Sequence, residues 1–384
     1  MKNIILFDPV EARANLLPLT LTRPVALLRH GITTIAEKWQ KAIPGAYSYS
    51  TQDYLSMKYP MVEAADGDNL FIAGNLHPDE QLVEAILSLE LGEALTLGEE
   101  IIARRGNGEP VSSKPYEGTP LAVNQVWDLF MLNDEALRRD FAALTAGRES
   151  QPLSDTCRLI GDPSQLFIEK GATIEGAIIN VAKGPVYVGR DAEIMEGACL
   201  RGPIALCEHA VVNMGGKIYG ATTLGPYCKV GGELNNVIMT GYSNKAHDGF
   251  LGNAVIGEWC NLGAGCTASN LKNTYAPVRV WNMSEERFVK TDLQFCGLIM
   301  GDHSKAGINT MFNTATVVGV GVNFYGAGFP RTFIPSFTEG STLGMKPVIM
   351  DRFFDTASRM MARRHKELTP IDKEIFITIN ETSL

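Results

Sequence analysis

The sequence predicts two parts of different fold class, an α/β domain in residues 1–150 followed by a parallel β-helix in residues 156–340. Strand-like and helix-like segments alternate through the first part, which is typical of an α/β domain with a mainly parallel sheet. In the second part aliphatic residues recur every six positions, a period that fits neither a helix nor a flat strand. Residues 341–384 form a third segment with helical spacing.

The first part contains five segments with a clear pattern. Residues 2–7 are apolar and β-branched, as in a buried strand, and "NLFIA" at 69–73 has the same character. Helical spacing appears in residues 23–42, 79–89 and 121–144. The polar, proline-containing stretch "GRESQPLSD" after residue 146 predicts the linker to the second part.

The second part shows an unbroken six-residue repeat over eight positions. Glycine often follows the aliphatic residue, which lets the chain turn a tight corner. The spacing predicts coils of three short strands, each strand with one inward aliphatic, and such coils must stack to bury these residues. The predicted inward positions are Ile168, Ile174, Val188, Ile194, Leu200, Leu206, Val212, Ile218, Leu224, Val230, Phe250, Ile256, Leu262, Met300, Ala306, Phe312, Val318 and Phe324.

The repeat lapses at two places, and a different pattern follows it. We expect residues 235–249 and 271–298 to be loops that leave the β-helix, the second of them as a hairpin. From Met350 the spacing predicts one helix that ends before Pro370 and is followed by a tail.

Composition narrows the classes of function. The net charge of −9 disfavours sequence-independent binding to nucleic acid or membranes, because both require a basic surface. The seven cysteines include no C-x-x-C pair, so we expect reduced thiols and no zinc site. The N-terminus lacks a cleavage site and no apolar run reaches 18 residues, so we expect a cytoplasmic protein.

The stretch "NKAHDGFLGNAVIGEWCNLGAGCTASN" at 244–270 resembles a known enzyme family. It is similar to the acetyltransferase core of the bifunctional N-acetylglucosamine-1-phosphate uridylyltransferase / glucosamine-1-phosphate N-acetyltransferase family. The segment "NLLPLTLTRPVALLRHGITTIAEKW" at 15–39 resembles the nucleotidyltransferase domain of that family. The resemblance implies a nucleotidyltransferase-like (Rossmann-like) first domain, a left-handed β-helix, acetyl-CoA as co-substrate and a homotrimer.

The resemblance also assigns roles within residues 244–270. It implies that His247 is the general base of acyl transfer and that the Ala264 N–H stabilises the oxyanion. By the same likeness the substrate-binding residues are Lys245, Phe250, Asn261 and Asn270. The family's sugar-phosphate-binding Arg and Lys align here with Gly231 and Asn235, so the phosphorylated acceptor has lost its usual partners.

The first domain departs further from the family pattern. Where the family has a glycine-rich phosphate loop, this chain reads "DPVEARAN", and Val25 replaces the lysine after Arg-Pro. Asp8, Arg13 and Arg23 are the candidates for a different nucleotide site. Magnesium is expected only if this domain is active, since "Gly74-Asn75" stands where the family has an aspartate ligand.

These observations favour CoA-dependent acyl transfer, with acetyl as the expected group, to the amine of a sugar phosphate or nucleotide sugar. One alternative is a sugar-1-phosphate nucleotidyltransferase whose β-helix serves assembly, and another is a non-enzymatic scaffold. The remaining histidines are not expected to be catalytic: His209 and His303 fall at repeat corners, and His30, His77 and His365 are expected at the surface.

Overall fold

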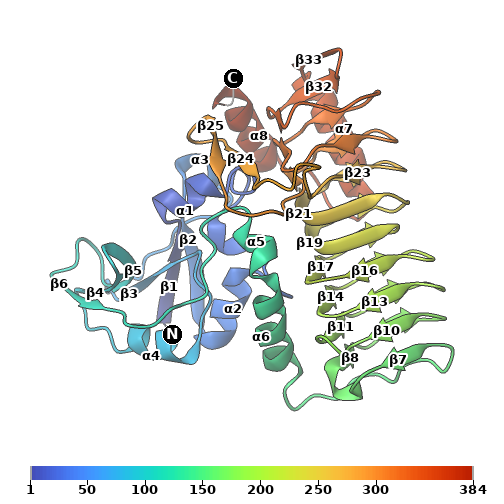
Figure 1. Cartoon of the computed structure of the whole chain (residues 1–384). Helices are drawn as coiled ribbons and strands as arrows, with labels where there is room; N and C mark the ends of the chain where they lie inside the picture. The colour runs from blue at the N-terminus through green and yellow to red at the C-terminus, as the bar shows by residue number, and fades with distance from the viewer. Residues whose placement is uncertain (1, 383–384) are drawn as a thin grey trace.

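The computed structural model describes residues 2–382, and it contains a mixed-sheet domain, a three-sided parallel β-helix and two C-terminal helices (Figure 1). The fold class predicted from the sequence is therefore confirmed. The hand of the β-helix stays a prediction. None of the helices in residues 2–382 is both long enough and apolar enough to cross a membrane.

The first sheet has the strand order β2-β1-β3-β5-β4-β6. Its strands pair in parallel at β1–β2, β1–β3 and β4–β6 and antiparallel at β3–β5 and β4–β5, so the sheet is mixed. The strands are β1 (Lys2–Phe7), β2 (Gly45–Ser50), β3 (Asn69–Ala73), β4 (Glu93–Leu97), β5 (Glu100–Arg105) and β6 (Ser112–Pro115).

The helices of this domain are shorter than the sequence pattern predicts. Residues 23–42 contain only the 3-10 turn η1 and helix α2, because Pro24 and the turn at Gly31 interrupt the spacing. Residues 121–127 precede the helices rather than belonging to them. The helices are α1 (Val10–Asn15), η1 (Val25–Leu27), α2 (Ile35–Ala42), α3 (Asp53–Ser56), α4 (Glu80–Leu87), α5 (Asp128–Met131) and α6 (Asn133–Thr145).

The β-helix, called the prism below, begins at β7 and has three faces built from parallel strands. The first face contains β7 (Arg158–Ile160), β10 (Ile178–Asn180), β13 (Cys199–Arg201), β16 (Lys217–Tyr219), the first halves of β19 (Glu233–Gly241) and β21 (Phe250–Glu258), and the pair β23 (Thr267–Ala268) and β28 (Met311–Phe312).

The second face contains the 3-10 turn η2 (Pro163–Gln165) at its start, then β8 (Leu166–Ile168), β11 (Val186–Val188), β14 (Ile204–Leu206), β17 (Thr222–Leu224), the second halves of β19 and β21, β26 (Ile299–Met300), β29 (Val317–Val318) and β31 (Phe333–Ile334). The third face contains β9 (Thr173–Ile174), β12 (Glu193–Ile194), β15 (Val211–Val212), β18 (Lys229–Val230), β20 (Asn244–Lys245), β22 (Asn261–Leu262), β27 (Lys305–Ala306), β30 (Asn323–Phe324), β32 (Thr338–Ser341) and the antiparallel β33 (Gly344–Pro347).

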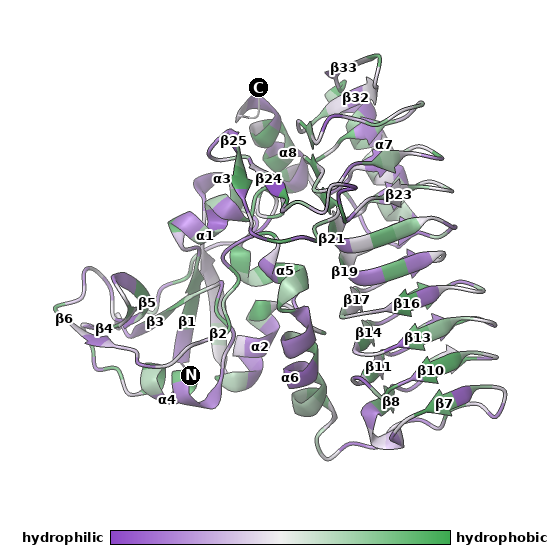
Figure 2. Cartoon of the chain, in the orientation of Figure 1, coloured by the Kyte–Doolittle hydropathy of each residue, from purple (hydrophilic) through white to green (hydrophobic). Residues whose placement is uncertain are grey.

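The hexad aliphatics fill the inside of the prism, as predicted. Leu224, Met239 and Ile256 are fully buried and lie in register on successive coils. Figure 2 shows the same alternation around each coil, where apolar residues recur between more hydrophilic stretches. Phe250 is an exception to the prediction, because Leu251 takes the inward position and Phe250 stays half-buried on the outer side.

The prediction that residues 235–249 form a loop outside the prism is wrong. Strands β19 and β20 keep this segment on the coil, and the six-residue spacing lapses only because the coil is shorter. Leu224 pairs with Met239, fifteen positions on, because the inward residues Val230 and Leu234 are four positions apart and Leu234 and Met239 are five apart, with Asn236 turning the second of these corners alone at a φ of +58°. Asn253 makes the same one-residue corner in β21 with a φ of +45°. Asparagine tolerates this left-handed conformation better than most residues.

The second excursion is a hairpin, as predicted. Strands β24 (Arg279–Asn282) and β25 (Arg287–Lys290) pair antiparallel, outside the prism sheets. The hairpin reaches the first domain, where Asn282 donates a hydrogen bond of 2.9 Å to Asn15. Trp281 stacks on Phe333 of β31 with ring centroids 4.9 Å apart.

The chain after the prism contains two helices rather than one helix and a tail. Helix α7 (Met350–Ala362) ends before the expected position, and α8 (Pro370–Thr382) begins at the proline that was predicted to follow the helix. Proline is well suited to the first position of a helix, which explains this difference. Phe353 and Phe376 from the two helices pack together. The helices themselves lie beside the end of the prism (Figure 1).

The first domain is packed against the second face of the prism. Ile238, Val255, Ile299 and Val317 on that face share one apolar cluster with the first sheet and its helices. Helices α5 and α6 lie between the sheet and the prism (Figure 1). The corner between the third and first faces therefore lies on the side away from the first domain, and α7 lies beside part of the third face.

Candidate functional site

His247 and Ala264 lie on the same corner of the prism, on neighbouring coils. Asn244 pairs with Asn261 in the strands that precede the two residues, which puts His247 level with Ala264. The next residues confirm this register, because the Gly265 N–H donates a hydrogen bond of 2.9 Å to the Asp248 carbonyl oxygen. Strands in one sheet lie ~4.8 Å apart, so both residues can reach one small group.

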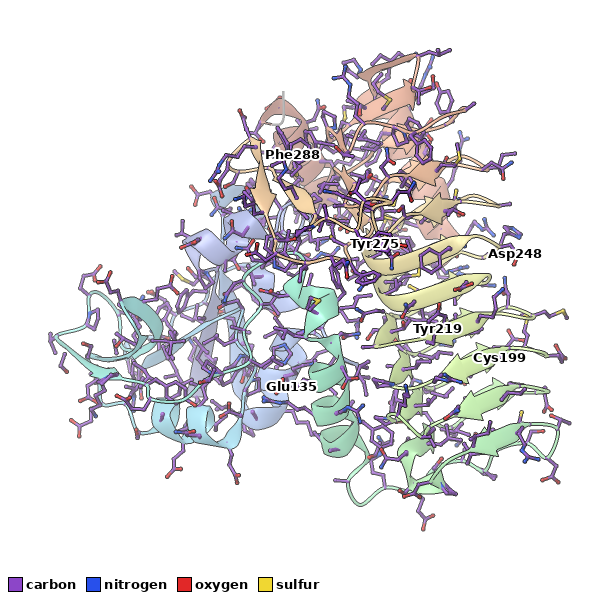
Figure 3. The ribbon with its side chains drawn as sticks, viewed as in Figure 1. Glu135, Cys199, Tyr219, Asp248, Tyr275 and Phe288 are labelled. Atoms are coloured by element: carbon purple, nitrogen blue, oxygen red, sulfur yellow. The ribbon has the colours of Figure 1, made fainter. Side chains whose placement is uncertain are left out.

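This corner joins the third face to the first face and is open to solvent. His247, Asp248 and Ala264 are exposed, and Figure 3 shows Asp248 at the outer edge of the prism, away from the first domain. Within residues 2–382 the Ala264 N–H has no hydrogen-bond acceptor, whereas its carbonyl oxygen accepts from Asn309 N–H at 2.7 Å. The free N–H is available to a ligand.

Lys245 lies inside the prism, not in a substrate site, so the role predicted for it is corrected. It pairs with Val230 at an inward position and its side chain is fully buried. Its Nζ donates a hydrogen bond of 2.9 Å to the carbonyl oxygen of His247. Burial lowers the pKa of Lys245 from its ordinary 10.5 to about 8, although Cys266 and Asp248 act in the opposite direction.

The other predicted substrate-binding residues lie on different sides of the His247 corner within one chain. Asn261 faces outward on the third face, and Phe250 lies at the start of β21 on the first face. Asn270 lies at the far corner of the first face, where its amide donates a hydrogen bond of 2.8 Å to Asn253. One prism therefore presents Asn261 and Asn270 on opposite sides of the His247 corner.

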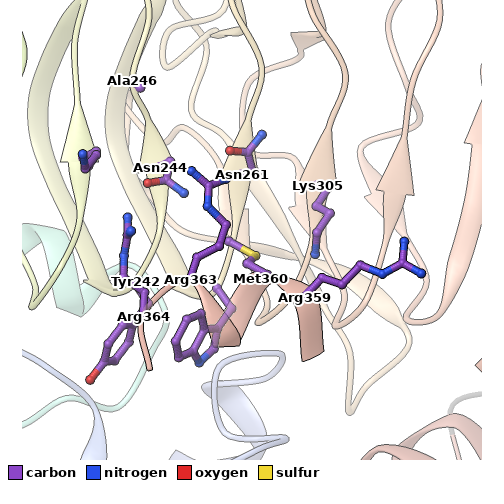
Figure 4. A pocket seen from close by; sticks show the side chains of 11 residues that line it. Tyr242, Asn244, Ala246, Asn261, Lys305, Arg359, Met360, Arg363 and Arg364 are labelled. Carbon is purple, nitrogen blue, oxygen red and sulfur yellow. The ribbon is translucent and has the colours of Figure 1, made fainter. Parts of the chain in front are cut away.

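A groove lies beside this corner, between the third face and helix α7 (Figure 4). The cavity has a volume of about 510 Å³. Its lining residues are Lys229, Tyr242, Asn244, Ala246, Trp259, Asn261, Lys305, Arg359, Met360, Arg363 and Arg364. We call it the cationic groove, because five of the residues that line it carry positive charge. Sequence analysis missed its arginines, although the run "ARRHK" in a predicted helix was the available signal.

An aromatic column forms the corner next to this groove. Tyr242 and Trp259 stack with ring centroids 4.2 Å apart, and Tyr227 continues the stack at 5.4 Å from Tyr242. His209 and His303 extend it at the two ends, so both histidines lie at repeat corners as predicted. All five residues have a φ between +55° and +59°, so the left-handed corner, repeated on each coil, aligns their rings.

Of the three candidates for a nucleotide site in the first domain, the structure brings together Asp8 and Arg13 but not Arg23. Asp8 lies 3.5 Å from Arg13 and accepts hydrogen bonds from the Thr51 hydroxyl and the Val25 N–H. Burial raises the pKa of Asp8, against the effect of these partners. Arg23 instead forms ion pairs with Asp302 and, at 2.8 Å, with Glu258. Its guanidinium joins the two domains.

Asp8 does line a cavity of about 410 Å³ at the carboxyl ends of β1 and β2. Arg104 lines the same cavity and lies over the Phe71 ring, 3.6 Å from its centroid. Ligands of open α/β sheets bind at this end of the strands. The arrangement does not fit a magnesium site: Asn75 is buried against Asn124, and within residues 2–382 no three His, Cys, Asp or Glu side chains form a metal-binding group.

The expectation that His30 and His77 are surface residues is wrong. Both are buried, and His30 Nδ1 lies 2.8 Å from His77 Nε2. Burial lowers the pKa of His30 to about 3, with the charge of Lys38 acting in the same direction, and it also lowers the pKa of His77. The pair is neutral at physiological pH and belongs to the core. His365 is exposed, as expected.

Comparison with known proteins relates the chain to sugar-modifying transferases. Residues 4–149 match the model of a family described as sugar nucleotidyl transferase. Over 87 residues the chain is 34% identical to the bifunctional protein GlmU of Methanococcus aeolicus, which is 23% of this chain and 20% of that protein. The corresponding protein of Methanocaldococcus jannaschii is 32% identical over 87 residues, 23% of this chain and 21% of that protein.

Two solved structures are similar at low identity. One is an Arabidopsis UDP-N-acetylglucosamine acyltransferase, at 14% identity and a TM-score of 0.25, over 56% of this chain and 80% of that one. The other is the acetyltransferase domain of PglB from Neisseria gonorrhoeae in complex with acetyl coenzyme A, at 12% identity and a TM-score of 0.19, over 91% and 100% of the two chains. The matched segment spans about a fifth of the length of the curated relatives. These matches, each over part of the chain, confirm that it is similar to the bifunctional transferase family and divergent from it.

Proposed function

We propose that the prism transfers an acyl group from CoA to the amine of a sugar phosphate or nucleotide sugar. Residues 4–149 of the same chain match the sugar nucleotidyl transferase family. The reaction takes place at the corner formed by His247 and Ala264. The expected acyl group is acetyl, and the expected donor is acetyl-CoA.

The proposed reaction requires a base and an oxyanion donor in reach of the same carbonyl. The amine nitrogen attacks the thioester carbonyl carbon, and the His247 imidazole accepts the proton that the nitrogen loses. The negative charge that develops on the carbonyl oxygen is stabilised by the Ala264 N–H. When the tetrahedral intermediate collapses, the carbon–sulfur bond breaks and the CoA thiolate leaves, taking the proton from the imidazolium.

The register of β20 on β22 is the observation that supports this proposal most directly. It brings an exposed imidazole level with an exposed N–H that has no acceptor within residues 2–382. Exposure leaves room for two substrates, and the fixed backbone of stacked coils keeps the two groups at a constant separation. A general base on a rigid element loses little free energy in reorganisation.

An acyl-transfer assay with the full chain tests the proposal. Acetyl-CoA would be offered with glucosamine 1-phosphate, glucosamine 6-phosphate and a panel of nucleotide sugars with free amines, and release of the CoA thiol would be followed. Turnover that depends on one of these acceptors supports the proposal. If acetyl-CoA binds with no acceptor giving turnover, and His247→Ala changes nothing in the slow hydrolysis of the thioester, the corner is not the site.

A second activity is proposed for the first domain, namely nucleotidyl transfer to a sugar 1-phosphate. The family match over residues 4–149 favours it, and the cavity at the carboxyl ends of β1 and β2 offers a place for the nucleotide. The absence of glycine from residues 1–30 argues against the usual phosphate loop. Release of pyrophosphate from nucleoside triphosphates and sugar 1-phosphates with Mg²⁺ distinguishes this activity from acyl transfer.

A further inference from the structure

The cationic groove combines five positive side chains, and within the described residues only Arg359 among them has a carboxylate neighbour, Asp355, at 3.8 Å. No carboxylate is among the described residues that line it, although the chain as a whole has a net charge of −9. The positive residues come from two walls: Lys229 and Lys305 from the third face, and Arg359, Arg363 and Arg364 from α7 and its C-terminal end. Clustering of like charges in one cavity is unfavourable unless an anion fills it.

Two of these cations lack the partners that buried charges usually have. Lys305 is half-buried, and its Nζ donates a hydrogen bond of 2.8 Å to the His303 carbonyl oxygen. Burial lowers the pKa of Lys305, although Cys260 acts in the opposite direction. The Nε atom of Arg364 is buried and has no hydrogen-bond partner within the described residues. Within residues 2–382 neither Lys305 nor Arg364 forms an ion pair, so both charges are available to an anion in the groove.

The spacing of the charges indicates an extended anion rather than a single phosphate. On the third face the register runs from Lys229 through Asn244 and Asn261 to Lys305, one coil at a time. Three coil steps of ~4.8 Å separate the two lysines by about 14 Å. One phosphate cannot contact both ends of this row. The two amides between the lysines supply donors and acceptors for the middle of a ligand.

We propose that the cationic groove binds the diphosphate of a nucleotide-type ligand that lies along the third face. Its volume of about 510 Å³ is within the range of small-molecule sites. Lys305 and Arg363 contact the phosphates, and Lys229, Tyr242 and Trp259 border the remainder of the ligand. CoA and a nucleotide sugar share this chemistry, so the experiment must distinguish them.

The groove ends beside the corner that carries His247, since Ala246 belongs to its lining. A diphosphate held there directs one end of the ligand toward the imidazole. This connection to catalysis rests on the proposed function, whereas binding in the groove does not. The inference extends the proposed function by assigning Lys229, Lys305, Arg359, Arg363 and Arg364 to the recognition of one substrate.

Isothermal titration calorimetry of the full chain tests the inference without turnover. The ligands are CoA, UDP-N-acetylglucosamine and inorganic pyrophosphate, each at low and high salt. Arg363→Ala and Lys305→Ala should each weaken binding of the correct ligand by at least about tenfold, the usual value of one charge-assisted hydrogen bond. Affinity should also fall with salt, because the contacts are ionic.

Arg352→Ala is the matched control, because Arg352 is an exposed arginine of the same helix outside the groove. It should bind as the wild type does. If CoA alone responds to the groove variants, the ligand is the acyl donor, and if the nucleotide sugar alone responds, it is the acceptor. The inference is overturned if neither binds, or if binding of all three ligands is the same in wild type, Arg363→Ala and Lys305→Ala.

The outcome separates this inference from the proposed function. If the chain binds CoA in the groove but transfers no acyl group, the inference stands and the proposed function is excluded. If the Arg363→Ala and Lys305→Ala variants transfer acyl groups with the wild-type KM, the proposed function stands and the inference is excluded. Circular dichroism and thermal unfolding of each variant confirm that the comparison is made between folded proteins.

Discussion

The ammonium group of Lys245 supports the backbone of His247 from inside the prism. Its Nζ donates a hydrogen bond of 2.9 Å to the His247 carbonyl oxygen, from an inward position that other coils fill with Val212 or Val230. A buried cation at such a position costs free energy because it is removed from water. Lys245 therefore holds the corner that carries His247, although an aliphatic residue at this position would be enough for the fold.

Lys245→Met should remove a pH dependence of stability. In the folded chain the pKa of Lys245 is about 8, below its ordinary 10.5, so between these values the unfolded chain holds a proton that the folded chain has released. The free energy of unfolding contributed by this group must therefore rise as pH increases through that window. Urea unfolding of wild type and Lys245→Met at pH 7.5 and 9.5 measures the difference.

Lys217→Met serves as the control for this experiment, because Lys217 is an exposed lysine on the first face. It should keep the wild-type increase of stability with pH. An unchanged increase in Lys245→Met would show that Lys245 has an ordinary pKa in the folded chain.

His247→Ala should lower the rate of acyl transfer by roughly 10²–10⁴-fold, the usual contribution of a general base. The side chain is exposed, so the melting temperature should change little. Steady-state kinetics with the true acceptor give the rate, and His365→Ala, at another exposed histidine, is the control. A wild-type rate in His247→Ala would place the base elsewhere.

Two copies of the chain are expected to form each site, in a homotrimer. His247 and Asn270 lie at different corners of one prism, so they meet only if a second prism is placed beside the first. A 1:1 mixture of His247→Ala and Asn270→Ala chains, unfolded and refolded together, should recover about a quarter of the wild-type activity by random assembly. Light scattering coupled to size-exclusion chromatography gives the mass, and a monomer at micromolar concentration would contradict this prediction.

Arg23→Met should destabilise the chain by about 3–5 kcal/mol, because it leaves the buried Asp302 carboxylate without its charged partner. The loss should appear as a lower urea midpoint, and it should be greater than that of Arg139→Met, which breaks only an exposed pair with Glu135. Equal midpoints for the two variants would show that the ion pairs between the domains contribute no net stability.

The six-residue period was sufficient to predict the prism, because each inward aliphatic occupies the same place on successive coils. The period failed where the corners changed length: Asn236 and Asn253 each turn the chain alone, and nothing in the spacing distinguishes a shorter coil from a loop. Lys245 was misplaced for a related reason. A lysine breaks the aliphatic pattern, so the inward position was not recognised.

The site was predictable only in part, since its components lie far apart in the sequence. The motif identified the His247 corner, but the cationic groove requires α7 to lie along the third face, and helical spacing does not show where a helix packs. The buried pair His30–His77 was missed for the same reason. Arg23 belongs to a motif that resembles a nucleotide site, yet in the folded chain it contacts Glu258 and Asp302, more than 200 residues away.

The hairpin β24–β25 is an insertion that leaves the strand pairing of the surrounding coils unchanged. Val255 and Ile256 precede the hairpin, and they pair with Ile299 and Met300, which follow it. The next coil therefore continues in the same register. A segment with this property can lengthen, shorten or change its sequence without shifting the phase of any later coil. The hairpin is nevertheless tied to the first domain, because Asn282 contacts Asn15 and the buried Val278 and Val280 belong to the apolar cluster of that domain. Changes in the first domain can therefore be matched by changes in the hairpin, while the register of the prism coils is preserved.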